Sequence, residues 1–462
     1  MSALHHLTIA EASTRIAERS LSPVELTEAV LRQIEARNDT LNAYVHVDAD
    51  GAMASAKAAE ADVAAGRHRG PLHGIPIGLK DIYDTADMPT TCHSNLFKAR
   101  RPREDAHTVA LLRDAGAVIL GKLATHEFAF GGPSWDIAFP PARNPWNTDH
   151  FTGGSSSGSG AAVAAGLALG AMGSDTAGSI RMPAHFCGLA GIKPTYGLAS
   201  RRGVSPLAYS LDHCGPLTWT TRDCALMLQA TAGHDPADPA SAKVEVPDYA
   251  AALTGDIAGL KVGLIRHFYE ADASATPEVR AAMDAAVATL GELGAAVEEV
   301  QLSPLQDYHA CNFVILLAEA LAIHEDDLAE SPELYGEIMR DRLYLATQIT
   351  GADYVQATRM RQTLCAELAA VLARCDVVVT AGGLLPAPEL TAIPKFYLLE
   401  TPFITSPFNV TGSPAHTVCI GFSDEGLPMG MQIAGRPFED ATVLKVGDAY
   451  ERATPWRDRR PS

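Results

Sequence analysis

The feature that most constrains how this sequence can fold is a run of glycines and serines that opens directly onto an apolar segment. Residues 153–160 read GGSSSGSG, and residues 161–171 continue as AAVAAGLALGA. A flexible linker has this composition, but a loose linker rarely continues straight into an alanine-rich run with the character of a buried helix. We therefore compared the run with known chemical motifs.

Three motifs resemble the glycine and serine run. A Walker A loop fails because Ser159 stands where the motif requires lysine, and a dinucleotide fingerprint fails because Val163 stands where it requires its last glycine. The GxSxG elbow of α/β-hydrolases matches Gly154–Gly158 with Ser156 at its centre, but a strand must lead into that elbow, and residues 144–152 read as a loop. An α/β-hydrolase-type esterase with Ser156 as nucleophile stays open as an alternative.

Two further segments combine small or apolar residues with groups that carry chemistry. Residues 173–183 read GSDTAGSIRMP, where small residues would let successive backbone N–H groups approach an oxyanion or a phosphate, although a simple tight turn also explains them. Residues 74–81 read GIPIGLKD, so Lys80 ends an apolar stretch. A desolvated lysine loses its charge readily and can act as a base, whereas a lone lysine in such a place often only extends to solvent.

Together the three segments resemble the amidase signature family of serine hydrolases. The motifs GIPIGLKD, GGSSSGSGAAVAAG and SDTAGSIRMPA carry the resemblance, and the interval of 24 residues from Ser155 to Ser179 is the family's usual one. Further segments agree, from NPWN at 144–147 to AYERATPW near the C-terminus. The resemblance implies an α/β amidase signature fold, in which helices cover both faces of a central, largely parallel or mixed twisted sheet.

The resemblance also implies a Ser–cis-Ser–Lys triad. Ser179 would be the nucleophile, Ser155 would follow a cis peptide bond from Gly154 and relay a proton, and neutral Lys80 would be the base. The oxyanion hole would be formed by the backbone N–H groups of Thr176, Ala177, Gly178 and Ser179. Residues expected to support the site are Gly154, Ser156, Asp175 and Arg181.

One departure from the family pattern concerns the oxyanion hole. The family commonly has two glycines before the nucleophile, and this chain has Ala177 and Gly178. If the backbone at position 177 required a positive φ, alanine would be strained there.

The hydrophobic patterns agree with an α/β fold in one domain over residues 1–462. Residues 1–65 read as helical, residues 70–225 contain the signature core, residues 233–258 read as a surface crossover, and residues 260–462 complete the sheet and helices. Strands are predicted at 117–120, 260–265, 376–380 and 417–422, and helices at 105–115 and 277–293. Because helices separate these strands, we expect a largely parallel sheet.

The family cleaves carbonyl C–N bonds, so the expected substrate is a small-molecule amide, with carbamates and esters accessible through the same acyl-enzyme. Residues proposed to bind the substrate are Phe128, Phe130, Gly131, Trp135 and Arg342, with Phe313 and Phe396 as further aromatic candidates. Residues 336–342 (GEIMRDR) are similar to the glutaminase subunit of glutamyl-tRNA(Gln) amidotransferase, where an arginine holds a substrate carboxylate. That glutaminase is the first alternative function, although TAGGLLPAP at 380–388 departs from its usual segment.

Composition excludes several classes of protein. The 36 Lys and Arg against 55 Asp and Glu give a net charge of −19, which argues against binding driven by nucleic-acid phosphates. No stretch of about 20 apolar residues predicts a membrane span, and the start lacks a signal-peptide pattern. The eight cysteines are scattered without a CxxC pair, so we expect free thiols in the cytoplasm, no metal and no cofactor. An obligate protein partner is not expected, and a homodimer stays open.

Overall fold

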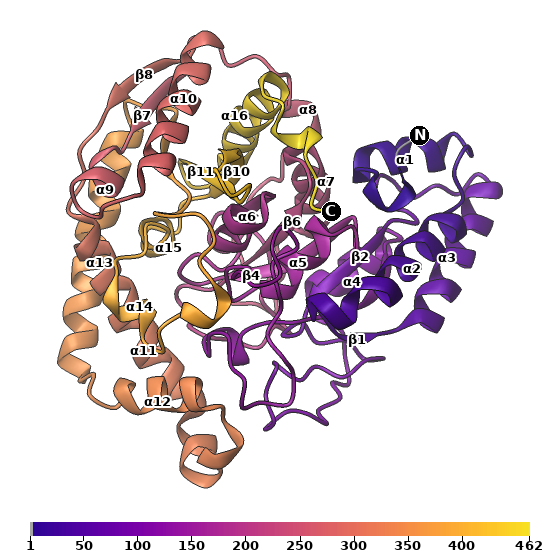
Figure 1. Ribbon diagram of the computed structural model, residues 1–462, viewed down its shortest axis with the longest axis horizontal. Coiled ribbons are helices and arrows are strands. Elements are labelled where there is room, and N and C mark those ends of the chain that lie inside the picture. The colour runs from indigo at the N-terminus through magenta and orange to yellow at the C-terminus, as the bar shows by residue number, and fades with distance from the viewer. Residues whose placement is uncertain (1–2) are drawn as a thin grey trace.

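The computed structural model describes residues 3–462, which are organised around one sheet of eleven strands (Figure 1). In order across the sheet, the strands are β1 (Tyr44–Val47), β3 (Val118–Leu123), β2 (Pro76–Lys80), β4 (Gly170–Asp175), β6 (His213–Thr218), β5 (Ala190–Lys193), β10 (Ala415–Phe422), β11 (Pro428–Gly435), β9 (Val377–Ala381), β7 (Lys261–Leu264) and β8 (Ala296–Glu299).

The sheet is mixed rather than largely parallel. Strand β2 runs parallel to β3 and β4, and β7 runs parallel to β8 and β9, but every pair from β4 across to β9 is antiparallel. The alternation of strands and helices therefore predicts the two parallel flanks and misses the centre. In the centre, β10 and β11 form a hairpin, and a long loop without a helix joins β5 to β6.

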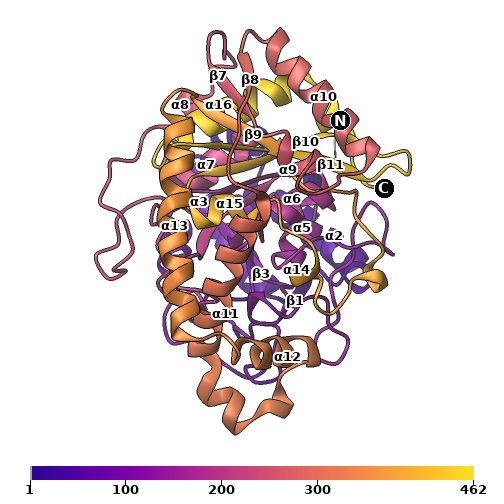
Figure 2. The same cartoon turned by 90° about the vertical axis from the view of Figure 1, so that its left-hand side faces the viewer.

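Helices pack around the sheet on both sides, as expected for the fold class. They are α1 (Ile9–Ala17), α2 (Pro23–Leu41), α3 (Ala49–Ala64), α4 (His107–Asp114), α5 (Ser157–Ala164), α6 (Arg181–Cys187), α7 (Thr221–Thr231), α8 (Tyr249–Ala252), α9 (His267–Glu270), α10 (Pro277–Glu292), α11 (Leu305–Glu330), α12 (Glu337–Ala346), α13 (Gly351–Leu372), α14 (Tyr397–Glu400), α15 (Ser406–Val410) and α16 (Asp440–Ala453). Helices α1–α3 and the pair α11 and α13 lie at opposite sides of the molecule (Figure 1), and α11 packs beside α13 (Figure 2).

The predicted elements lie where the hydrophobic patterns place them. Strands β3, β7, β9 and β10 and helices α4 and α10 coincide with the predicted segments to within a few residues. The N-terminal segment is not wholly helical, because YVHV at Tyr44–Val47 forms strand β1 against β3. The crossover at 233–258 contains the short helix α8.

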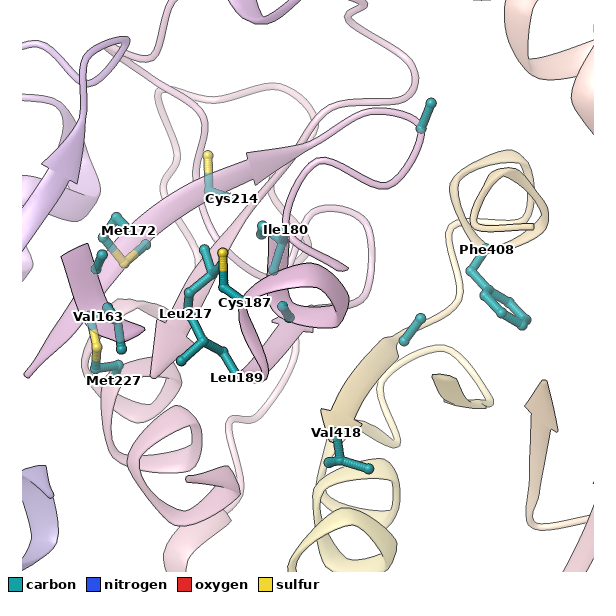
Figure 3. Packing of buried hydrophobic residues seen from close by; sticks show 14 of the residues in the cluster. Val163, Met172, Ile180, Cys187, Leu189, Cys214, Leu217, Met227, Phe408 and Val418 are labelled. Carbon is teal, nitrogen blue, oxygen red and sulfur yellow. The ribbon is translucent and has the colours of Figure 1, made fainter. Parts of the chain in front are cut away.

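The glycine and serine run is part of the core and not a linker. Every residue from 153 to 160 is buried, and helix α5 begins within the run at Ser157. At Gly158 a Cβ atom would come within 2.4 Å of the backbone of Ala43 and Ala124, so the close packing requires glycine. Figure 3 shows Val163 of α5 with Met172 of β4 and Leu217 of β6 in the hydrophobic cluster.

No helix within residues 3–462 combines the length and the hydropathy that a bilayer span requires. All eight cysteines are free.

Candidate active site

The candidate site lies at the ends of two neighbouring parallel strands. Strand β2 ends at Lys80 and strand β4 ends at Asp175, and the two strands pair in parallel register. The carboxyl ends of parallel strands are where α/β proteins commonly build ligand sites, because the loops that follow diverge there. The loop before α5 and the loop before α6 both reach this edge, and they carry the two candidate serines.

Lys80 is fully buried and lies between two serine hydroxyls. Its Nζ atom is 2.7 Å from Oγ of Ser155 and 2.8 Å from Oγ of Ser174. Burial lowers the pKa of Lys80 to about 7, although the negative charges of Asp175 and Asp212 act in the opposite direction. A large fraction of the lysine is therefore neutral near neutral pH, as a base must be.

Ser155 is fixed by its backbone. A cis peptide bond joins it to Gly154, and its carbonyl oxygen accepts a hydrogen bond from His126 N at 3.0 Å. The ring of His126 packs against Gly154 so closely that a Cβ atom there would lie 1.9 Å from Cε1. Only glycine fits beside this ring.

Ser179 opens onto the same small pocket as Ser155. Both residues line it, together with Gly154, Thr176 and Ala177. Ser179 is partly exposed, whereas Ser155 is buried. Within residues 3–462 no hydrogen bond engages the Ser179 hydroxyl, so it is free to approach a substrate carbonyl.

The loop at residues 176–179, which is expected to form the oxyanion hole, departs from that expectation at one position. The N–H of Gly178 donates to the Asp175 carboxylate at 2.8 Å, so it is already used. The N–H groups of Thr176, Ala177 and Ser179 have no partner among residues 3–462, and these three residues line the pocket. The structure therefore leaves three of the four expected donors available.

The conformation of the same loop explains how alanine is accommodated at position 177. The positive φ falls on Gly178, at 130°, and not on Ala177. A Cβ atom at position 178 would lie 2.2 Å from Thr405 Oγ1. Glycine is thus required at 178, and alanine is unstrained at 177.

Asp175 and Arg181 hold this loop from within. Arg181 Nε and Nη2 lie 3.0 and 2.9 Å from the Asp175 carboxylate, and both side chains are fully buried. Arg181 also donates to Gln432 Oε1 at 2.7 Å. Although burial alone would raise it, the pKa of Asp175 is held well below its usual range, mainly by the charge of Arg181. The pair is a buried anchor and not the surface ion pair that a flanking Asp and Arg often form.

Ser156 is buried, and its hydroxyl bonds the backbone of a neighbouring strand. It is fully buried, and its Oγ atom bonds both the N–H and the carbonyl of Ser174, each at 3.2 Å. No strand precedes it, since residues 144–152 form turns and two isolated bridges. Neither the geometry nor the accessibility of a hydrolase elbow is present at Ser156.

Only some of the aromatic residues proposed to bind the substrate line the pocket. Phe130 and Phe313 line the same pocket as Ser155 and Ser179. Phe128 packs in the core against His324, with ring centroids 4.5 Å apart, and Trp135 is exposed at the surface. Gly131 and Phe396 also lie outside the pocket lining.

Arg342 lies behind the pocket wall. Its guanidinium is 5.3 Å from the ring centroid of Phe130 and 5.4 Å from that of Tyr397, which both line the pocket. It bonds the carbonyl oxygens of Phe130 and Lys395 and no carboxylate, and burial lowers its pKa to about 10. In this structure Arg342 supports the wall and does not reach the pocket.

An apolar groove continues from the pocket of Ser155 and Ser179. The groove has a volume of about 260 Å³ and shares Met182, Tyr397 and Phe403 with the pocket. None of the residues that line the pocket or the groove is Asp, Glu, Lys or Arg. The pocket and the groove together suit an apolar group joined to an amide.

Several residues of the site were not predicted from the sequence. Ser174 lies within one of the three motifs, but nothing in one sequence distinguishes its contact with Lys80 from an ordinary strand position. His126, Tyr397, Phe403 and Thr405 come from segments without a motif, and only the fold brings them to the site. Among residues 3–462, no three His, Cys, Asp or Glu side chains gather as metal ligands.

Comparison with known proteins supplies the family context. The family model Amidase matches residues 25–444. A glutamyl-tRNA(Gln) amidotransferase subunit of Chloroflexus aurantiacus is 40% identical over 490 aligned residues, covering 100% of this chain and 99% of that protein. An amidase of Pseudomonas putida is 41% identical over 472 residues, covering 100% of this chain and 99% of that protein. The crystal structure of a bacterial aryl acylamidase of the amidase signature family superimposes with a TM-score of 0.89 at 26% identity, covering 99% of each chain.

Proposed function

The chain belongs to the amidase signature family, and on that premise we propose that it is a serine amidase acting through Ser179, Ser155 and Lys80. Its proposed substrates are amides that carry an apolar group next to the scissile bond. The observation that carries the proposal is the 2.7 Å approach of Lys80 Nζ to Ser155 Oγ, at a pocket that Ser179 also lines. A base within hydrogen-bond reach is what a serine hydroxyl needs to become a nucleophile.

The proposed reaction has two halves. Neutral Lys80 takes the proton of Ser155, and Ser155 takes that of Ser179 as Ser179 Oγ bonds to the carbonyl carbon. The N–H groups of Thr176, Ala177 and Ser179 face the oxyanion. The proton returns through Ser155 to the nitrogen, the C–N bond breaks and the amine leaves.

Water completes the second half through the same relay. It gives its proton to Ser155 and Lys80 as its oxygen bonds to the acyl carbon, and the ester bond to Ser179 breaks with return of that proton. The products are a carboxylic acid and an amine. Lys80 ends in the neutral state in which it began.

A second candidate function is the glutaminase component of an amidotransferase. Its support is the 40% identity to the Chloroflexus aurantiacus protein, whose name describes it as one subunit of such an enzyme. The identity to the Pseudomonas putida amidase is 41%, so overall similarity does not separate the two. The lining of the pocket and of the apolar groove favours the amidase, because none of those residues is charged, whereas glutamine carries an ammonium and a carboxylate.

The test uses the purified chain without added proteins. We expect it to hydrolyse the anilide of an apolar acid with a kcat/KM at least about 100-fold above that for glutamine. Replacing Phe403 with Ala should lower kcat/KM for the anilide by about tenfold, because an apolar contact is lost. Ammonia release from glutamine that occurs only when partner chains are added would instead support the amidotransferase function.

A further inference from the structure

Ser174 is a partner of the base that the proposed triad leaves out. Its Oγ atom lies 2.8 Å from Lys80 Nζ, nearly as close as Ser155 Oγ at 2.7 Å. Lys80 makes no other side-chain hydrogen bond among residues 3–462. The amine is thus held between two hydroxyl groups, one on the loop before α5 and one on strand β4.

The backbone of Ser174 is rigidly placed. Its N–H and its carbonyl both bond Ser156 Oγ at 3.2 Å, and it pairs with Cys214 across the antiparallel β4–β6 ladder. The backbone from which the Ser174 hydroxyl extends is therefore held in place beside Lys80. This also gives Ser156 a purpose within the site, since Ser156 fixes the residue that contacts the base.

A neutral amine has two N–H donors and one lone pair. The proposed relay works only if the lone pair faces Ser155, because Ser155 must give its proton to it. A second hydroxyl beside the amine can act in two ways. It can donate its proton to the lone pair and so compete with Ser155. It can instead accept an N–H of the amine, and the lone pair then points away from this second hydroxyl. The surroundings of Ser174 decide between these arrangements.

Ser174 lines a surface cavity of about 650 Å³, which shares Ala129 and Leu207 with the pocket of Ser155 and Ser179. The cavity opens between exposed residues such as Arg202 and Tyr209, and Asp212 also lines it. Among residues 3–462, Ser174 Oγ has no hydrogen-bond partner other than Lys80, so its hydroxyl proton can point toward this cavity. Its oxygen lone pairs are left for the Lys80 amine.

We propose that Ser174 is a positioning residue that accepts one N–H of Lys80 and thereby directs the lone pair of the amine at Ser155. The inference rests on the proposed function, because it assigns Lys80 the role of base. In the ammonium form, Lys80 donates to both serines. Hydrogen bonds to a charged donor are stronger than those to a neutral one, so Ser174 also stabilises the charged form.

Other titratable groups near Lys80 must be considered in a pH experiment. Those that face it are Asp175, Asp212, Cys92, Cys214 and His126. Burial raises the pKa of Cys92 to about 12 and that of Cys214 to about 11, and burial lowers the pKa of His126 well below its usual value. The pKa of Asp175 is held low, so Asp212, whose pKa burial raises, is the other group to follow.

The matched variants are Ser174→Thr and Ser174→Val. They have nearly the same shape and differ in the hydroxyl alone, and both suit a strand. Ser159→Ala is the control. It removes a buried hydroxyl on α5 whose only hydrogen-bond partner among residues 3–462 is the carbonyl oxygen of Met172, on the same strand β4 as Ser174. For each variant, kcat, KM, the pH profile and the rate of labelling by a fluorophosphonate are measured.

We expect Ser174→Val to lower kcat at least about tenfold relative to Ser174→Thr with KM within about threefold. Its acid limb should move to lower pH by about half a unit to one unit, because the charged form loses an acceptor. Ser159→Ala should match the wild type. Equal kcat, labelling rates and acid limbs in the Thr and Val variants would overturn the inference, whereas failure of the wild type to be labelled would overturn the proposed function itself.

Discussion

The Lys80 amine and the Ser155 hydroxyl lie 2.7 Å apart, although 75 residues separate them in the sequence. One ends strand β2, and the other follows a cis peptide bond in the loop before α5. Both are buried, so the contact is shielded from water and from competing ions.

The pH dependence of kcat/KM should report Lys80 of the free enzyme. Burial lowers the pKa of Lys80 to about 7, so below pH 7 most of the lysine is protonated and cannot accept a proton. Activity should therefore rise as pH increases through 7 and then level off. A profile that is flat from pH 5 to 9, or one that rises only near pH 10, would contradict this assignment.

Replacing Lys80 with Met should remove the base while filling the buried space. We expect kcat/KM to fall about 10³- to 10⁴-fold, because positioned general bases contribute on that scale. The circular dichroism spectrum should match that of the wild type, and the exposed Lys57→Met should keep full activity. A folded Lys80→Met enzyme with a tenth or more of the wild-type kcat/KM would exclude Lys80 as the base.

The exchange of glycine and alanine should cost more stability and more activity at position 178 than at position 177. Gly178→Ala places a Cβ atom at a φ of 130° and 2.2 Å from Thr405 Oγ1, so the loop must shift. We expect a loss of about 1–3 kcal/mol in the free energy of unfolding and a large loss of kcat. Ala177→Gly should cost only about 0.5–1 kcal/mol. Urea unfolding and steady-state kinetics on both variants test this, and equal effects would refute the geometry described for the loop.

The fold and the meeting of the three motifs in space could largely be predicted from the sequence, for a physical reason. The segments GIPIGLKD, GGSSSGSG and SDTAGSIR need small residues at close packing, as Gly154, Gly158 and Gly178 illustrate, so their composition is unusual enough to be recognised. The β-branched runs of β3, β7, β9 and β10 likewise indicate buried strands.

The features that could not be predicted from the sequence depend on tertiary contacts. The use of the Gly178 N–H by Asp175 depends on how the loop wraps around that carboxylate. The antiparallel centre of the sheet depends on how β5, β6, β10 and β11 pair, which no local pattern encodes. The pocket wall from Tyr397 to Phe403 depends on the path of a long loop, and apolar residues such as Phe128 and Phe130 cannot be told apart before the core is assembled.

Removing the Asp175 carboxylate should destabilise the protein strongly. Asp175→Asn leaves the buried Arg181 guanidinium without its charge partner, which typically costs about 3–5 kcal/mol of stability. The control is Asp149→Asn, because Asp149 is 86% exposed and lies 3.9 Å from Arg143, so its loss should cost at most about 1 kcal/mol. Urea unfolding at pH 7 measures both variants. A loss of less than about 1 kcal/mol for Asp175→Asn would mean that the pair does not hold the loop.

Ser179 and Ser156 are the two serines that rival interpretations name as the nucleophile. Ser179 is partly exposed at the pocket, whereas Ser156 is buried with its hydroxyl bonded to Ser174. The most direct test is to inactivate the purified chain with a fluorophosphonate, digest it and locate the adduct by mass spectrometry, with Ser179→Ala as the unlabelled control. We predict a single adduct on the peptide that contains Ser179, with fragment ions that place it on that residue. An adduct on Ser156, or undiminished labelling of Ser179→Ala, would contradict the proposed mechanism.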